Sequence, residues 1–192
     1  MKQEMVEMKK TFNISHICMI ALAIVLNIVG AQIALFLKLP IYLDCIGTVM
    51  IAALYGWFYA MIPNLLSGLI FGMTTDIYSL YFAPVGMLLG VLIAIVWNDR
   101  LDRGWYLLGA AFLVTLPTSL CSACISAWLF GGITSSGSSV LVQLLAKTPL
   151  SLTVSCFIVQ FCTDFLDRLL SLFLVRALWK KLPERYRHLR NQ

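Results

Sequence analysis

The chain has 192 residues, of which 60% are hydrophobic and 12% charged, and its mean hydropathy is +0.89. A soluble globular domain is typically about 45–50% apolar and about 25% charged, so this composition excludes an ordinary soluble domain. Apolar stretches of roughly 20 residues, the length that crosses a bilayer, follow one another along the chain. Because lipid offers the backbone no hydrogen-bond partners, we expect an all-α membrane protein.

The formal net charge of +5 is concentrated in the last quarter of the chain. A basic tail can bind nucleic acid, but an excess of Lys and Arg on the cytoplasmic side of a membrane protein explains it more simply. We therefore expect no nucleic-acid partner. The basic residues of this region are Arg168, Arg176, Lys180, Lys181, Arg185, Arg187 and Arg190.

The first apolar run, residues 14–37, is longer than the roughly 7–15 apolar residues of a signal peptide, so we interpret it as a retained first span. Residues 82–98, 105–130 and 150–178 are three further clear spans. The apolar stretch 41–73 decides the topology, because the number of times it crosses the membrane fixes the side of each later connection. The distribution of positive charge requires that it cross either twice or not at all.

Positive charge places both termini and the 98–104 connection in the cytoplasm, through residues Lys2, Lys9, Lys10, Arg100, Arg103 and the basic tail. An even number of spans must therefore precede that connection. As one helix, the 41–73 stretch would extend about 50 Å, against a bilayer core of about 30 Å. We divide it near Gly56–Pro63 into spans 41–57 and 60–74. The prediction is a single domain, residues 1–192, forming a six-helix transmembrane bundle with both termini cytoplasmic.

The outer connections of this topology are residues 38–44, 74–82 and 131–149, and the last contains the flexible run Gly131–Ser139. Aromatic and polar residues gather near them, as in a small-molecule pocket, although Tyr and Trp also collect at any membrane interface. Asp44 either contacts a ligand or caps the helix that starts at Cys45. The candidate ligand-binding residues are Tyr42, Asp44, Asn64, Asp76, Tyr78, Tyr81, Trp128, Gln143 and Lys147.

The last span contains Asp164, Asp167 and Arg168. Asp164 and Arg168 are four residues apart, which predicts a neutralised pair on one helix face, with a proton relay as the alternative. The C-x-x-C of Cys121 and Cys124 has no second pair or nearby His, so we assign it to helix packing rather than to a metal or redox site. The sequence has no nucleotide-binding G-x-x-x-x-G-K-[ST] motif and no H-E-x-x-H motif, so we expect neither catalytic residues, nor a metal, nor a resident cofactor.

Small or compact residues recur every fourth position in the first span, at Ala23, Asn27 and Ala31, and form a stripe that another helix can approach closely. Three segments together carry a resemblance to a known family: this stripe, the segment Leu39-Pro-Ile-Tyr-Leu-Asp-Cys-Ile-Gly-Thr48, and the closing helix from Asp167 to Pro183. The chain resembles the S-component of an energy-coupling factor (ECF) vitamin transporter. The resemblance covers most of the chain and depends on the order of these segments.

The resemblance implies a subunit of a bacterial cell membrane that captures a vitamin from outside. A separate transmembrane coupling protein and two cytoplasmic ATPases would drive uptake, and the stripe Ala23, Asn27 and Ala31 would contact the coupling protein. Asn27 stands where the family usually has the middle alanine, so its amide must find a partner. The L-P-I-Y-L-D-x-I-G-T pattern is most similar to S-components for cobalamin-type ligands, and the 131–139 run could serve as a lid; other vitamins remain open.

Two alternatives compete with this interpretation. One is a stand-alone secondary transporter or membrane enzyme in which Asp164 or Asp44 is protonated, since ionisable residues at membrane depth are functional candidates by default. The other is a structural membrane subunit that binds no small molecule.

Overall fold

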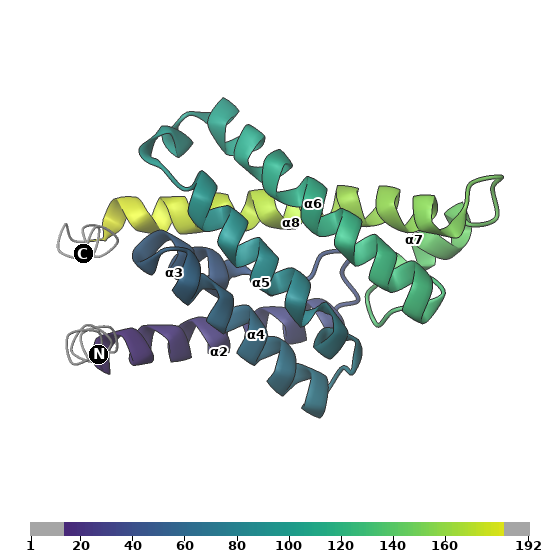
Figure 1. Cartoon of the computed structure of the whole chain (residues 1–192), viewed down its shortest axis with the longest axis horizontal. Helices are drawn as coiled ribbons and strands as arrows, with labels where there is room; N and C mark the ends of the chain where they lie inside the picture. Colours follow the sequence, from purple (N-terminus) through teal and green to yellow (C-terminus); the bar gives the residue numbers. More distant parts are fainter. Residues whose placement is uncertain (1–13, 183–192) are drawn as a thin grey trace, which may run out of the picture.

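The computed structural model describes residues 14–182, and all regular secondary structure in this range is helical (Figure 1). The prediction of an all-α protein is thus confirmed for these residues. Four helices, α2, α4, α5 and α6, are long and apolar enough to cross a membrane, which makes the chain a multi-pass helical membrane protein. The elements are α2 (Ile14–Phe36), α3 (Ile46–Tyr55), α4 (Trp57–Thr74), α5 (Tyr78–Val96), η1 (Asp99–Asp102), α6 (Gly104–Phe130), α7 (Ser138–Leu145) and α8 (Leu152–Lys181).

Part of the charge that supported the predicted topology falls on positions beyond this range. These residues, Lys2, Lys9, Lys10, Arg185, Arg187 and Arg190, lie outside the described residues, as does Pro183.

The largest difference from the expected spans is at the start of α3. The helix begins at Ile46 rather than at residue 41, and its ten residues extend only about 15 Å, half of a bilayer core. Leu43 has a positive φ of 53°, which interrupts any helix there. The chain reverses at Gly56, whose φ of +84° favours glycine, so that α4 starts at Trp57 rather than at residue 60.

Helices α2 and α8 lie along the long axis of the molecule, α4, α5 and α6 run obliquely to them, and two ends can be distinguished (Figure 1). We call one the η1 end: it holds the start of α2, the turn at Gly56, η1 and the end of α8. At this end the rings of His16 and Tyr55 lie 4.4 Å apart, and those of Trp97 and Trp179 lie 5.7 Å apart. We call the opposite end the pocket end; it holds the connections 37–45, 75–77 and 131–151. Because α2 starts and α8 ends at the η1 end, the path agrees with an even number of crossings, and the side of the membrane that this end faces stays a prediction.

The main hydrophobic core lies between α3, α5, α6 and α8. Val49, Leu89, Ile93 and Leu172 are buried there, with Trp179 closing the cluster toward the η1 end. Large apolar side chains are also exposed along the outer surfaces of α2 and α6, as expected for helices that face lipid. A second, smaller cluster at the pocket end packs α7 against α6 and α8; its buried members are Ala123, Val142, Cys156 and Val159.

The stripe of compact residues on α2 packs inside the chain. Ala23 and Asn27 are fully buried against α3. The Asn27 amide donates to Thr48 Oγ1 at 2.9 Å, and its oxygen accepts from the Gly47 N–H at 2.8 Å. A Cβ at Gly47 would lie 2.1 Å from the Ala23 carbonyl oxygen, so the approach requires glycine. This corrects the surface expected to meet a coupling protein: α3 already covers Ala23 and Asn27, and the third member, Ala31, lines the pocket described below.

Candidate ligand-binding site

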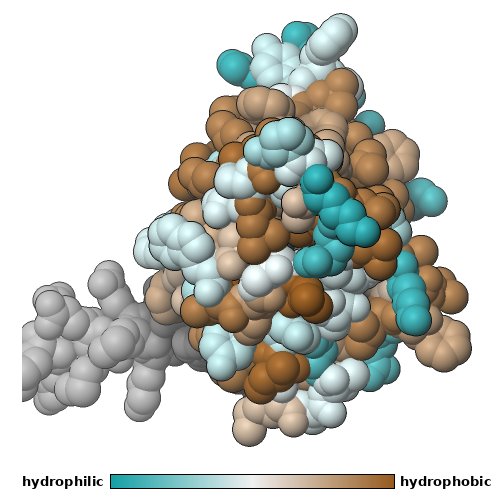
Figure 2. All heavy atoms as spheres, turned by 90° about the vertical axis from the view of Figure 1, so that its right-hand side faces the viewer, coloured by the Kyte–Doolittle hydropathy of each residue, from teal (hydrophilic) through white to brown (hydrophobic). Residues whose placement is uncertain are grey.

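A concave pocket opens at the pocket end of the bundle, with about 810 Å³ of empty space counted with its mouth. Residues of α2, α4, α5, α6 and α8 line it, together with the connections 37–45 and 131–137. Figure 2 views this end, where teal, pale and brown residues are mixed over the face. Polar and apolar side chains both line the pocket.

Five of the nine predicted ligand-binding residues line this pocket: Tyr42, Asp44, Asn64, Asp76 and Tyr78. They come from four different segments, and the fold brings them together. Asp44 does not cap α3, because the helix has no side-chain cap and its N-cap residue is Cys45. That alternative is wrong, and Asp44 faces the pocket instead.

The other four predicted residues lie away from the pocket. Trp128 is 79% exposed, and Tyr81 packs edge-on against the Phe130 ring at 5.2 Å. Gln143 and Lys147 are exposed on α7 and just after it. All four lie toward the pocket end of the bundle, but the rotations of α5 and α6 and the path of α7 turn their side chains away from the pocket.

The pocket also contains residues that the candidate set left out, notably Gln160, Asp164 and Arg168 of α8. Their spacing of four residues places them on one stripe of a long helix. Three polar side chains on one face of a mostly apolar helix are a signal that the sequence did carry, since such residues usually face a bundle interior or a cavity.

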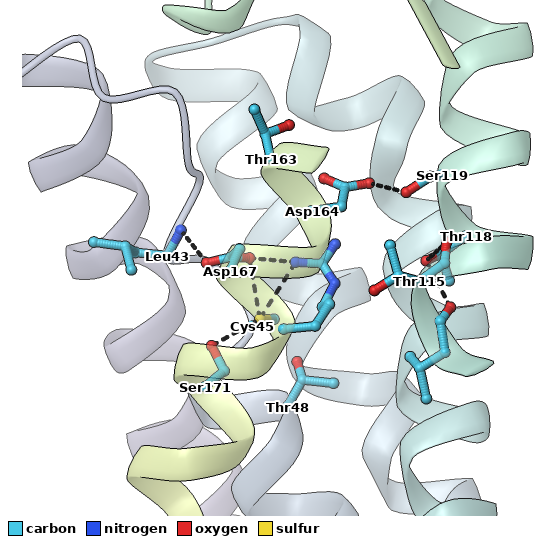
Figure 3. A network of polar contacts seen from close by, with 12 residues as sticks. Leu43, Cys45, Thr48, Thr115, Thr118, Ser119, Thr163, Asp164, Asp167 and Ser171 are labelled. Atoms are coloured by element: carbon cyan, nitrogen blue, oxygen red, sulfur yellow. Dashed lines mark hydrogen bonds and ion pairs between the residues drawn. The ribbon is translucent and has the colours of Figure 1, made fainter. Parts of the chain in front are cut away.

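A buried polar network joins α8 to the connection before α3 (Figure 3). The Asp167 carboxylate accepts from the Leu43 N–H at 3.0 Å, from the Cys45 thiol at 3.4 Å and from Arg168 Nη1. The Cys45 thiol also contacts Ser171 Oγ at 3.1 Å. These contacts hold the connection 37–45 against the middle of α8, which explains why the chain is not helical before Ile46.

The ion pair of α8 is therefore Arg168 with Asp167, and the predicted pair of Asp164 with Arg168 is wrong. Asp164 turns toward α6 instead, where Ser119 Oγ donates to its Oδ2 at 2.7 Å. Figure 3 shows the two carboxylates pointing toward different neighbours. As a result, Asp164 lies in the pocket with a hydroxyl partner and no ion-pair partner among residues 14–182.

Two buried polar atoms of the pocket lining have no hydrogen-bond partner: Gln160 Oε1 and Arg168 Nε. Gln160 is 4% exposed and Arg168 is 7% exposed, so water reaches neither side chain freely. Buried polar atoms in native proteins are normally hydrogen-bonded, and each exception calls for an explanation. A bound polar molecule would supply both missing partners.

Among residues 14–182, one group could offer three ligand atoms to a metal: Asp44, Cys45 and Asp167, whose ligand atoms lie within 4.8 Å of one another. The Arg168 guanidinium already donates to two of the three, Cys45 and Asp167. The geometry fits an internal ion pair better than a metal centre.

The segment 131–137, which we call the roof segment, covers part of the pocket. It leaves α6 through Gly131, in the left-handed conformation, and its residues Thr134 and Ser135 line the pocket. Ser135 Oγ donates to Asp76 Oδ2 at 2.6 Å, and Ser79 Oγ donates to the same oxygen at 3.1 Å. One strong hydrogen bond thus fastens the roof segment to the connection between α4 and α5.

No family model, no curated protein and no solved structure matches this chain. The fold and the site by themselves define a multi-pass helical membrane protein with a polar pocket at one end of its bundle.

Proposed function

We propose that the chain is the substrate-binding S-component of an ECF-type vitamin importer in a bacterial cell membrane. It captures a vitamin from outside in the pocket and delivers it through a transmembrane coupling protein and two cytoplasmic ATPases. The observation that carries the proposal is the pocket itself, whose lining combines two buried polar atoms without partners, aromatic rings and part of the roof segment. A few oriented polar groups on apolar walls are typical of small-molecule sites.

The sequence is consistent with a chain that binds the vitamin while other subunits hydrolyse ATP. It has no phosphate-binding loop, so energy from ATP must come from partners in this proposal. The chain itself performs no chemistry and needs no resident cofactor; the vitamin is its cargo.

The segment Leu39–Thr48 is similar to cobalamin-type S-components, which makes cobalamin the first vitamin to test. A corrinoid is far larger than a drug-sized molecule, so its entry would require the roof segment to move away from the mouth of the pocket.

The buried stripe also changes where the coupling protein would dock. The part of α2 that remains reachable is its exposed apolar face, which includes Leu22, Val25 and Val29. Val25→Trp would leave the pocket untouched while altering that face. Ala23→Trp, by contrast, would force α2 away from α3, because Ala23 is fully buried.

The test measures vitamin uptake by cells that express the chain with and without a coupling protein and its ATPases. We expect uptake only with the complete set and loss of uptake, with ligand binding retained, in Val25→Trp. Uptake at the same rate by the chain alone would overturn the proposal.

One observation favours a second candidate, a stand-alone proton-coupled transporter: Asp44 and Asp164 both line the pocket without an ion-pair partner among the described residues. Ionisable residues inside a membrane often form proton relays. Vesicles that contain only the purified chain distinguish this candidate, because a proton gradient would then drive uptake, and Asp164→Asn would abolish it.

A further inference from the structure

We propose that the pocket selects a small organic cation, a molecule that carries a protonated amine or a protonated nitrogen heterocycle. This inference rests on the proposed function and names the class of ligand that the same site takes. It follows from the charge of the lining, from one buried side-chain oxygen without a hydrogen-bond donor, and from the aromatic walls.

The lining carries an excess of negative charge. Three carboxylates, those of Asp44, Asp76 and Asp164, face the pocket, and the only basic side chain among the described lining residues is Arg168. Its guanidinium is already bound to Asp167 and to the Cys45 sulfur. No Lys or Arg nitrogen of the described residues lies within 4.0 Å of the Asp44 or Asp164 oxygens.

An unpaired carboxylate among packed helices is costly, because burial removes the water that stabilises its charge. A ligand cation placed between Asp44 and Asp164 would restore that stabilisation. An anionic ligand would meet three carboxylates and could be held only by Arg168, whose transfer from Asp167 would leave a buried charge uncompensated. The electrostatics of the site therefore discriminate between ligands by the sign of their charge.

Gln160 gives an independent indication of the same ligand. Its Oε1 is a buried acceptor without a donor, one helical turn from Asp164 on the face that lines the pocket. A protonated nitrogen with more than one N–H can donate to Gln160 and Asp164 together. Arg168 Nε, one turn further along α8, is a donor without an acceptor, so the ligand also offers one acceptor on that side.

Aromatic rings complete the walls, with Tyr42, Phe71, Tyr78 and Phe82 among the lining residues. The faces of such rings attract cations, and the attraction grows when the site excludes water. Rings and carboxylates together are thus suited to a flat or compact organic cation.

The experiment uses the full-length chain in lipid nanodiscs and an equimolar mixture of micronutrients sorted by charge. The mixture contains pyridoxamine and spermidine as protonated amines, thiamine and choline as quaternary cations whose charged nitrogen has no N–H, riboflavin and cyanocobalamin as neutral molecules, and biotin, pantothenate and folate as anions. After removal of unbound molecules, mass spectrometry identifies what the protein retains. We expect a protonated amine to be retained.

Asp44→Asn and Asp164→Asn remove the charges with little change of shape, and the amide oxygen at position 164 can still accept from Ser119. We expect each to lower the affinity for the retained cation about tenfold or more, since one charge-assisted hydrogen bond contributes about 1.5–3 kcal/mol. Asp99→Asn, at an exposed carboxylate of the η1 end, is the matched control and should bind as the wild type does. Thermal unfolding of each variant shows that the bundle still folds.

Retention of a quaternary cation, a neutral molecule or an anion would overturn this inference and leave the proposed function standing, and so would a retained cation whose affinity neither pocket variant changes. If the wild-type chain retains nothing from the mixture, this inference falls, and the uptake experiment with and without the coupling protein and ATPases decides the proposed function separately.

Discussion

At the η1 end, basic side chains and carboxylates meet one another. Arg176 Nε donates to Asp102 Oδ1 at 2.7 Å, and Lys180 Nζ lies 3.1 Å from the same oxygen. At the pocket end, three carboxylates line a cavity and the one arginine there is bound to Asp167, outside that set. The first end pairs its charges, through a buried arginine and a half-exposed carboxylate, whereas the second leaves a negative excess among packed helices.

The comparison separates charges that stabilise the fold from charges that are available to a ligand. Exposed ion pairs contribute little and are easily replaced by water. A carboxylate that stays unpaired inside a helical bundle lowers stability, so its presence indicates a role outside folding. The Asp167–Arg168 pair lies beside the pocket but stabilises the fold, because it is buried and holds the connection 37–45 against α8.

The largest effect is expected for Asp167→Ala. The substitution leaves the Arg168 guanidinium buried without its carboxylate and frees the Leu43 N–H. Removing one member of a buried pair typically costs about 3–5 kcal/mol. We expect a loss of that size in the free energy of unfolding, measured by reversible unfolding in mixed micelles. Asp102→Ala is the control at the η1 end, and a loss as large there would contradict the difference between the two ends.

A smaller loss is expected for Asn27→Ala. Both halves of the Asn27 amide are bonded to α3, and alanine would leave the Gly47 N–H buried without an acceptor. Leaving such a group unsatisfied costs about 1–3 kcal/mol. Val25→Ala, on the exposed face of the same helix, should change stability by less than about 0.5 kcal/mol. If the two variants unfold alike, α2 is not held to α3 by this amide.

The sequence was enough to predict the long helices, because the length of an apolar run reports directly on the thickness of the membrane. It could not predict the path of residues 41–45. That path depends on a hydrogen bond from Leu43 to Asp167, a residue 124 positions away. The spacing of Asp164 and Arg168 likewise predicted a pair within one helix, while Ser119 of α6 offered Asp164 a different partner.

Sequence spacing also could not give the tertiary contacts of the residues expected to meet a coupling protein or of those expected to bind a ligand. The compact residues at Ala23 and Asn27 correctly indicate close approach, but spacing alone does not say which helix approaches, and α3 of the same chain does. Trp128 was placed near the site by its position along α6, and the rotation of that helix exposes it instead. Position along the membrane axis is readable from sequence, whereas the orientation of each helix depends on its neighbours.

The pocket end offers a third test, in the hydrogen bond that fastens the roof segment. Ser135→Ala removes the bond to Asp76 and should speed dissociation of the retained micronutrient by about two- to tenfold, the equivalent of about 0.5–1.5 kcal/mol. Ser79→Ala removes a bond to the same Asp76 oxygen without loosening the roof segment. Stopped-flow measurements on both variants distinguish the two, and equal dissociation rates would exclude a role for the roof segment in holding the ligand.

The smallest effect is expected at the η1 end, from Asp102. A hydrogen bond from Arg176, aided by Lys180, lowers the pKa of the Asp102 carboxyl from 3.8 to about 2. Because the pKa is lower in the folded state than in the unfolded chain, the pair stabilises the fold above about pH 4, and this contribution is lost as the pH falls toward about 2.

The Asp102 side chain is 45% exposed, so water screens the pair, and its contribution should be only about 0.2–1 kcal/mol. The melting temperature of the wild type should exceed that of Asp102→Asn near neutral pH, and the difference should close on acidification. Asp99→Asn is the matched control, because the Asp99 carboxylate is fully exposed and lies 3.7 Å from Arg176 Nη2. A difference that persists unchanged at low pH would mean that Asp102 stabilises the η1 end through something other than its charge, and the contrast between the two ends would then no longer be one of paired against unpaired carboxylates.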